Sequence, residues 1–165
     1  MGARRTVGPV VSILEKLSPA ALAARALRTR RLVRAPIWLY QHGLGAVLGP
    51  RMVMIEHTGR TSGEPRYVVL EVVDRPDPDT VIVCSGFGET SQWYRNLRAR
   101  PECRVTVGRR ERAAHADLLD SEASAAVLHR YRSAHPAAWE RLRGAIEHAV
   151  GHTVDGLPMV RLRLS

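Results

Sequence analysis

The sequence predicts an α+β fold, mainly β, in which an antiparallel barrel of about six strands carries helices at both ends. Three observations support this prediction. Short runs rich in β-branched and aromatic residues follow one another from residue 51 onward. Tight turns join most of these runs, as in antiparallel barrels. Helical spacing of apolar residues prevails in the first fifty residues and again from about 120 to 150.

Six segments have the composition of strands. In the last segment charged and apolar residues alternate, which is the pattern of a half-buried strand. Pro76-Asp77-Pro78-Asp79 is a turn between the second and third segments, and Gly108-Arg109-Arg110 is a turn between the fourth and fifth. The expected strands are Met52–Glu56, Tyr67–Val73, Thr80–Cys84, Arg104–Val107, Glu111–Leu119 and Pro158–Leu164.

The N-terminal part of the chain is expected to be helical. Ser18-Pro19 supplies an N-cap followed by a first-turn proline. Pro36 is expected to interrupt the helix, and the aromatic cluster Ile37–Tyr40 follows it. We therefore divide the chain into a basic helical segment, residues 1–36, and a barrel domain, residues 37–165.

Two further helices are expected before the last strand. Asp120 or Ser121 caps the first, which runs to about Ser133. Pro136 opens the second, and Gly151 ends it.

Charge is concentrated at the N-terminus. The first fifty residues hold eight Arg or Lys and one Glu, a net of +7 out of +9 for the chain. A basic helix beside Trp and Tyr can lie on an anionic bilayer, so residues 1–40 are a candidate for peripheral contact with the inner face of the cell membrane. Alternatively, these helices pack on the domain and expose their arginines to water. No DNA-binding motif is present, and we predict no nucleic-acid partner.

Cysteine and histidine usage points away from disulfides and metals. Cys84 and Cys103 are the only cysteines and form no C-x-x-C pair, which indicates free thiols and a cytoplasmic protein. His148 and His152 have no acidic partner at zinc-site spacing, so no metal is predicted. The sequence also lacks a P-loop and a nucleophile elbow, so a cofactor would supply the chemistry of an enzyme on this scaffold.

The segment from His57 to Arg66 lies between the first two expected strands and reads as a hairpin loop. Its glycines let backbone N–H groups converge on an anion, and its arginines match phosphate oxygens. The segment is therefore a candidate phosphate-binding loop, although a simple solvated hairpin tip has the same composition.

The segment from Cys84 to Leu97 is a second candidate. A strand enters a glycine-containing loop, and Ser91 is placed to cap the helix that follows. Trp93 and Tyr94 beside Asn96 can form a wall and a polar anchor for a planar heterocycle. The alternative is a core tryptophan next to a capping loop.

Together these segments resemble a known family. The stretches HTGRTSGEPRYVVLEVV and VIVCSGFGETSQWYRNLRARPECRVTVG are similar to the deazaflavin-dependent nitroreductases, over about residues 37–120. The resemblance implies an FMN-binding-like split β-barrel and coenzyme F420 as the cofactor. It also implies hydride transfer from the reduced deazaflavin to an electron-poor acceptor, such as an enone, a quinone or a nitro compound.

The resemblance also implies roles for individual residues. The phosphate and polyglutamate tail of the coenzyme would be anchored by the loop, with Arg60, Thr61, Ser62, Gly63 and Arg66. The deazaflavin ring would be lined by Val68, Val69, Leu70, Ser85 and Gly86, and the pocket completed by Trp93, Tyr94 and Asn96. The proton would come from Tyr131, His135, Tyr94 or solvent.

The chain departs from the family pattern at Thr61 and near Gly86, where many members have lysine, and it has no tyrosine in the late helices beyond Tyr131. Two alternatives therefore stay open. One is an FMN-binding split-barrel oxidoreductase, and the other is a non-enzymatic, membrane-associated lipid or fatty-acid binder. The protein is expected to be a monomer or a homodimer.

Overall fold

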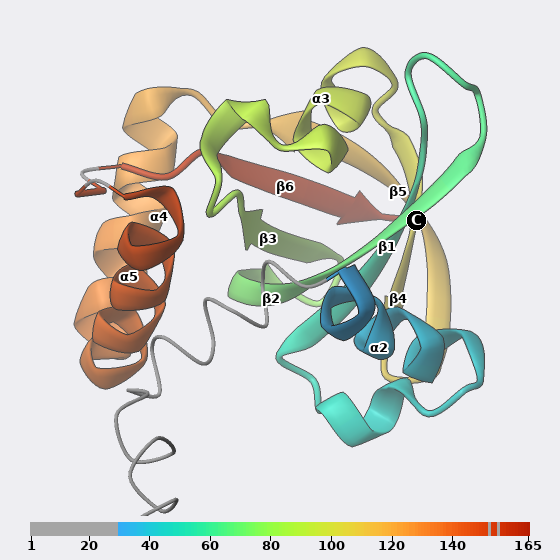
Figure 1. Cartoon of the computed structure of the whole chain (residues 1–165), viewed down its shortest axis with the longest axis horizontal. Helices are drawn as coiled ribbons and strands as arrows, with labels where there is room; N and C mark the ends of the chain where they lie inside the picture. The colour runs from blue at the N-terminus through green and yellow to red at the C-terminus, as the bar shows by residue number, and fades with distance from the viewer. Residues whose placement is uncertain (1–29, 152, 155) are drawn as a thin grey trace, which may run out of the picture.

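The computed structural model describes residues 30–151, 153–154 and 156–165. Six antiparallel strands close into a barrel in the order β1-β2-β3-β6-β5-β4 (Figure 1). The strands are β1 (Met52–Thr58), β2 (Pro65–Asp77), β3 (Thr80–Cys84), β4 (Glu102–Val107), β5 (Arg110–Leu118) and β6 (Met159–Leu164). The predicted fold class is confirmed.

Strand β2 is longer than its composition predicted. It begins at Pro65, which pairs with Thr58 of β1, and it continues past two register shifts until Asp77 pairs with Thr80. The expected four-residue turn therefore shrinks to Pro78 and Asp79. Pairing with β1 and β3 decides these ends, because each paired residue satisfies backbone groups that composition alone does not place.

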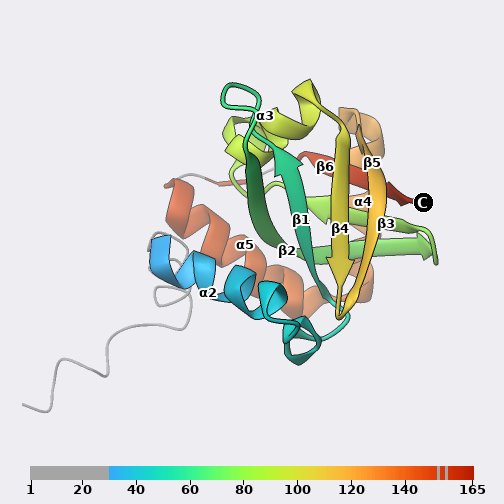
Figure 2. The ribbon, with the colours of Figure 1, turned by 90° about the vertical axis from the view of Figure 1, so that its right-hand side faces the viewer.

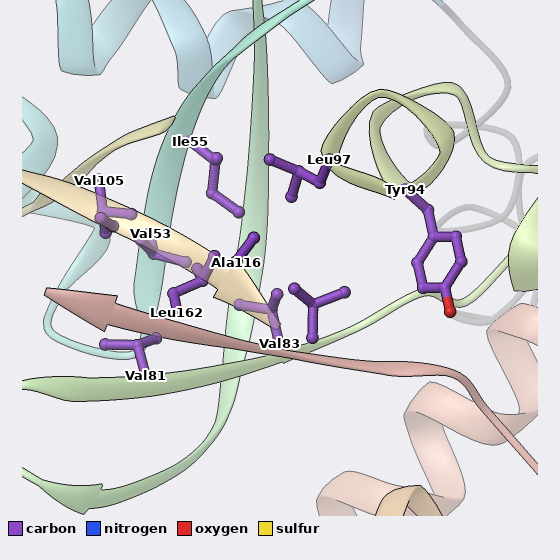
Figure 3. Packing of buried hydrophobic residues seen from close by; sticks show 11 residues of the cluster. Val53, Ile55, Val81, Val83, Tyr94, Leu97, Val105, Ala116 and Leu162 are labelled. Carbon is purple, nitrogen blue, oxygen red and sulfur yellow. The ribbon is translucent and has the colours of Figure 1, made fainter. Parts of the chain in front are cut away.

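The barrel core is apolar and is closed at one end by helix α3 (Gln92–Ala99). Inward-facing strand residues such as Val53 and Ile55 share one buried cluster with Leu97 and Tyr94 of α3. Figure 3 shows Leu97 lying between the α3 ribbon and Ile55. Since Leu97 is fully buried, α3 acts as a plug in this end of the barrel.

Helices α4 (Ser121–Ala134) and α5 (Pro136–Val150) cover one outer side of the barrel, where they pack on Ile82 and Met159 (Figure 1). Asp120 caps α4, since its Oδ1 accepts a hydrogen bond from the Ala123 N–H at 2.8 Å. Gly151 ends α5 in a left-handed conformation. Both predicted helices are confirmed.

Helix α2 (Arg30–Gln41) and the short helix η1 (Gly45–Leu48) precede the barrel on another side (Figure 2). The expected interruption at Pro36 is wrong, because α2 runs through it and across the boundary that we drew between residues 36 and 37. A proline removes one helical hydrogen bond, and packing beyond it can hold the helix. Here Tyr40 is buried, and its hydroxyl donates to the Met52 carbonyl at 2.7 Å.

The expected helix start at Ser18-Pro19 lies outside the described residues. Among the helices that the structure does describe, none combines the length and apolar character needed to cross a bilayer.

Candidate functional site

A pocket of about 540 Å³ opens at the plugged end of the barrel, between the β1–β2 loop and α3. These two segments lie side by side in Figure 2. The pocket is lined by His57, Gly59, Arg60, Thr61, Ser62, Arg66, Tyr67, Val68, Gln92, Trp93 and Asn96. The structure therefore brings the phosphate-loop candidates and the α3 candidates to one place.

The β1–β2 loop is tight because its glycines allow it. The Gly59 N–H donates to the Glu64 carbonyl, and the Gly63 N–H donates to the Gly59 carbonyl, both at 2.8 Å. A Cβ atom at Gly59 would lie 2.6 Å from the Ser62 hydroxyl, and Gly63 has a φ of +71°. In this fold of the loop, the backbone N–H groups of Thr61 and Ser62 have no partner among the described residues.

Neighbouring residues of α3 face different ways. Successive residues of a helix are about 100° apart, so residues three positions apart share a face. Trp93 and Asn96 line the pocket, whereas Tyr94 and Leu97 belong to the barrel cluster. The predicted wall of Trp93 and Tyr94 is thus divided. Of these two residues, Trp93 lines this pocket, where Tyr67 and His57 also present rings.

A chain of hydrogen bonds ties the loop to α3 and to the barrel. Asn96 Oδ1 accepts from the Arg60 backbone N–H at 3.1 Å and from its guanidinium at 2.9 Å. The same guanidinium donates to Gln92 Oε1 at 3.0 Å. On its other side, Asn96 Nδ2 lies 3.2 Å from His57 Nδ1.

The pocket carries uncompensated positive charge. Among the residues that the structure describes, no Asp or Glu lines it. The Arg60 guanidinium donates only to neutral amide oxygens, and the Arg66 guanidinium forms neither an ion pair nor a hydrogen bond within the described part of the chain. Burial, together with the charge of Arg66, lowers the pKa of His57 to about 4, so this histidine is neutral at pH 7. An anion is the ligand that this electrostatic environment favours.

The predicted ring-lining residues of β2 divide between two faces, because strand residues alternate. Val68 lines the pocket, and with Leu70 it packs on the barrel core. Val69 falls between them in the strand and therefore has the opposite face.

Ser85 and Gly86 shape the loop that leads to α3, which includes the short helix η2 (Gly88–Thr90). The Ser85 hydroxyl is fully buried, donates to the Gly88 carbonyl at 2.6 Å and is hydrogen-bonded with the Ser91 hydroxyl at 2.9 Å. Ser91 holds the N-cap position of α3 without a side-chain capping bond. A Cβ atom at Gly86 would lie 3.2 Å from Ile146, so α5 occupies the space that a side chain would need here.

The candidate proton donors lie away from this pocket. Tyr131 is buried between α4, α5 and the barrel, and its hydroxyl donates to Glu71 Oε1 at 3.3 Å. His135 is exposed where α4 meets α5, with its ring 5.4 Å from that of Tyr131. Neither residue is among those that line the pocket.

Four residues line the pocket but were not among the predicted site residues: His57, Gly59, Tyr67 and Gln92. A signal for His57 was present, because it continues the inward-facing positions of Val53 and Ile55 on β1. Gln92 precedes Asn96 by four residues, the spacing of one helical face.

Both cysteines are free, as expected, and burial raises the pKa of each thiol to about 12. Within the described ranges, no group of three or more His, Cys, Asp or Glu residues could hold a metal ion.

Comparison with known proteins identifies the family. Residues 32–144 match the family model of F420H(2)-dependent quinone reductases. This match spans more than half of the chain. The chain belongs to this family. The enzyme is therefore an oxidoreductase of an F420-dependent class, as the resemblance in its two motif segments implied.

Individual proteins are similar to this chain in sequence or in fold. The chain is 27% identical over 112 residues to a candidate F420H(2)-dependent quinone reductase of Mycobacterium tuberculosis, Rv3178, covering 67% of this chain and 87% of that protein. An F420-H2 dependent reductase, FDR-A, has a similar fold, with a TM-score of 0.50 and 21% identity over 68% of this chain and 94% of the other.

The fold extends beyond reductases. HutZ, a haem storage protein from Vibrio cholerae, matches with a TM-score of 0.50 and 12% identity over 81% of this chain and 90% of the other. Because one barrel serves different ligands, the site residues have to carry the functional argument.

Proposed function

We propose that this enzyme binds coenzyme F420 with its phosphate and tail in the pocket between the β1–β2 loop and α3, and reduces an electron-poor small molecule. The observation that carries the proposal is that Arg60 and Arg66 both line a pocket to which no described Asp or Glu contributes. Guanidinium groups without carboxylate partners are suited to a phosphodiester and to glutamate carboxylates.

The donors in this pocket fit the anionic part of the coenzyme. The backbone N–H groups of Thr61 and Ser62 are unpartnered within the described chain and can add hydrogen bonds to phosphate oxygens. Thr61 stands where many family members have lysine, so hydroxyl and backbone donors replace one charge. The other family lysine lies near Gly86, and in this chain Ile146 packs against Gly86.

The ring would extend from the tail pocket along the segments that the resemblance names. Trp93 offers a flat apolar wall beside Val68, and Asn96 fixes the loop that holds the tail. When bound, the reduced deazaflavin supplies a hydride to an enone, a quinone or a nitro compound. The protein contributes binding and orientation, which place donor and acceptor in contact.

The source of the proton is a separate proposal. Tyr131 is buried beside Glu71, and both burial and that carboxylate raise its pKa, so its hydroxyl stays protonated at neutral pH. His135 is exposed next to it. Neither residue lines the pocket at the loop. Either residue would therefore donate a proton only where the deazaflavin ring reaches toward α4.

We also propose that the N-terminal part of the enzyme contacts an anionic membrane from the cytoplasmic side. Apolar side chains are exposed on α2, on η1 and between them, with Trp38 52%, Leu44 40% and Val47 77% exposed. The preceding 36 residues hold eight basic groups. Exposed apolar groups beside a basic segment are typical of peripheral contact with anionic lipid.

The first test is a titration of the purified protein with oxidised coenzyme F420, followed by quenching of the coenzyme's fluorescence, with FMN run in parallel. We expect saturable binding of F420 in preference to FMN. Arg60→Gln and Arg66→Gln should each weaken binding by about tenfold to hundredfold, because each removes charge-assisted hydrogen bonds. Turnover of the reduced coenzyme with a naphthoquinone, a cyclic enone and a nitroimidazole would then identify the acceptor.

Arg110→Gln is the matched control, since Arg110 begins β5 directly after the turn from β4, at the other end of the barrel. It removes the same charge and should leave the affinity unchanged. Equal losses in all three variants would mean that only net charge matters and would contradict the assigned pocket. Preference for FMN would support a flavin enzyme, and binding of neither would favour the lipid-binding alternative.

A further inference from the structure

His57 is a buried histidine in the wall of the proposed tail pocket, and the proposed function gives it no role. It is 4% exposed and is the last inward-facing residue of β1 before the loop. It pairs in register with Arg66 across the β1–β2 hairpin. Its ring therefore sits between the barrel and the residues that would hold the coenzyme.

The hydrogen bonds of Asn96 define the protonation pattern of His57. Two N–H groups of Arg60 converge on one atom of the Asn96 amide, at 3.1 and 2.9 Å, and only an oxygen can accept both. The NH₂ group of Asn96 then faces His57 Nδ1 at 3.2 Å. Nδ1 must accept this bond, so the ring proton resides on Nε2.

The result is a directional relay across 39 residues of sequence. His57 accepts from Asn96, Asn96 accepts from Arg60, and Gln92 accepts a further bond from the same guanidinium. If Nδ1 carried a proton, two N–H groups would oppose each other, and the Asn96 amide would have to turn its NH₂ group toward Arg60. The orientation of Arg60 thus depends on an acceptor at the Nδ1 position of residue 57.

We propose that His57 is a positioning residue, which through Asn96 orients the Arg60 guanidinium toward the anionic part of the coenzyme. This inference rests on the proposed function of the pocket. It assigns His57 no contact with the reacting atoms, so its effect belongs to coenzyme affinity and not to the rate of hydride transfer.

Substitutions at residue 57 test the acceptor directly. Asparagine places an amide oxygen near the Nδ1 position, whereas glutamine places its polar atoms near Nε2, and leucine has none. We expect His57→Gln and His57→Leu to weaken F420 binding by about tenfold, with His57→Asn within about threefold of wild type. The maximal rate at saturating coenzyme should change little in all three.

A double-substitution cycle separates positioning from general loosening of the structure. In an Arg60→Gln background, His57→Leu should cause no further loss of affinity, because its effect passes through Arg60. Additive losses, or a His57→Asn variant as weak as His57→Leu, would overturn the inference. Circular dichroism and denaturation of each variant confirm that the compared proteins are folded.

Failure of this inference is distinguishable from failure of the proposed function. If wild type binds F420 and Arg60→Gln weakens it while His57→Leu does not, only the role of His57 fails. If wild type does not bind F420, ¹⁵N spectra of histidine-labelled protein still decide the relay. They should report a neutral ring protonated on Nε2, and an Nδ1–H ring would overturn it.

Discussion

At the scale of single residues, His57 makes the enzyme's stability depend on pH. In the unfolded chain its pKa is the ordinary 6.5, and in the folded protein burial and Arg66 lower the pKa to about 4. Between these values the unfolded chain binds a proton that the folded protein does not. The part of the free energy of unfolding that depends on neutral His57 is therefore fully present above pH 6.5 and is lost as the pH falls toward 4.

Between pH 7 and pH 5, titration of His57 should lower the free energy of unfolding by about 2 kcal/mol, because each unit of pKa difference corresponds to about 1.4 kcal/mol. Urea denaturation of wild type and His57→Asn at both pH values measures it. The carboxylates titrate in both proteins, so the difference between their pH dependences isolates His57. Parallel pH profiles for the two proteins would contradict this assignment.

At the scale of elements, each of the two faces of α3 has its own role. One face plugs the barrel with Leu97 and Tyr94, and the other presents Trp93 and Asn96 to the pocket. Anchoring of the plug therefore holds the site in place. A helix of eight residues gains most of its stability from such packing, since short helices are marginal in isolation.

Leu97→Ala should lower the free energy of unfolding by about 2–5 kcal/mol, because it opens a cavity in a fully buried position. Leu44→Ala, at a position that is 40% exposed, is the matched control and should cost less than about 1 kcal/mol. Chemical denaturation with equal m-values for both variants provides the comparison. A similar loss at the two positions would mean that α3 does not plug the barrel.

At the scale of the whole molecule, charge and exposed apolar groups gather on one part of the chain. The first fifty residues hold a net charge of +7 out of +9 for the chain, and Trp38 of α2 and Val47 of η1 are exposed. The proposed contact with an anionic bilayer would involve both features, and it would bring the enzyme close to apolar acceptors such as quinones.

We expect the 165-residue chain to sediment with vesicles that contain phosphatidylglycerol and to leave them as salt is raised, because screening weakens the electrostatic part of binding. Replacing Trp38 and Val47 by serine should reduce binding at low salt. Phe87→Ser, which removes an exposed apolar group from the loop before α3, is the control. Equal binding to neutral phosphatidylcholine vesicles would contradict the proposal.

Much of the architecture could be predicted from residue order alone, because the relevant signals are local. The six strands, the caps at Asp120 and Gly151 and the tight loop around Gly59 each depend on residues within a few positions of one another. The family and its cofactor class follow for the same reason, since the motif segments are contiguous in the chain.

Other features depend on residues that are distant in the sequence, and only the tertiary structure determined them. The helix through Pro36, the separation of Tyr94 from Trp93, and the distance of Tyr131 from the loop pocket all follow from packing. The relay from His57 to Arg60 exists only because barrel closure brings α3 onto the β1–β2 hairpin. The residues next to a given residue in the sequence determine its backbone preference. The residues that pack around it in the folded protein determine its protonation, its hydrogen-bond partners and its role.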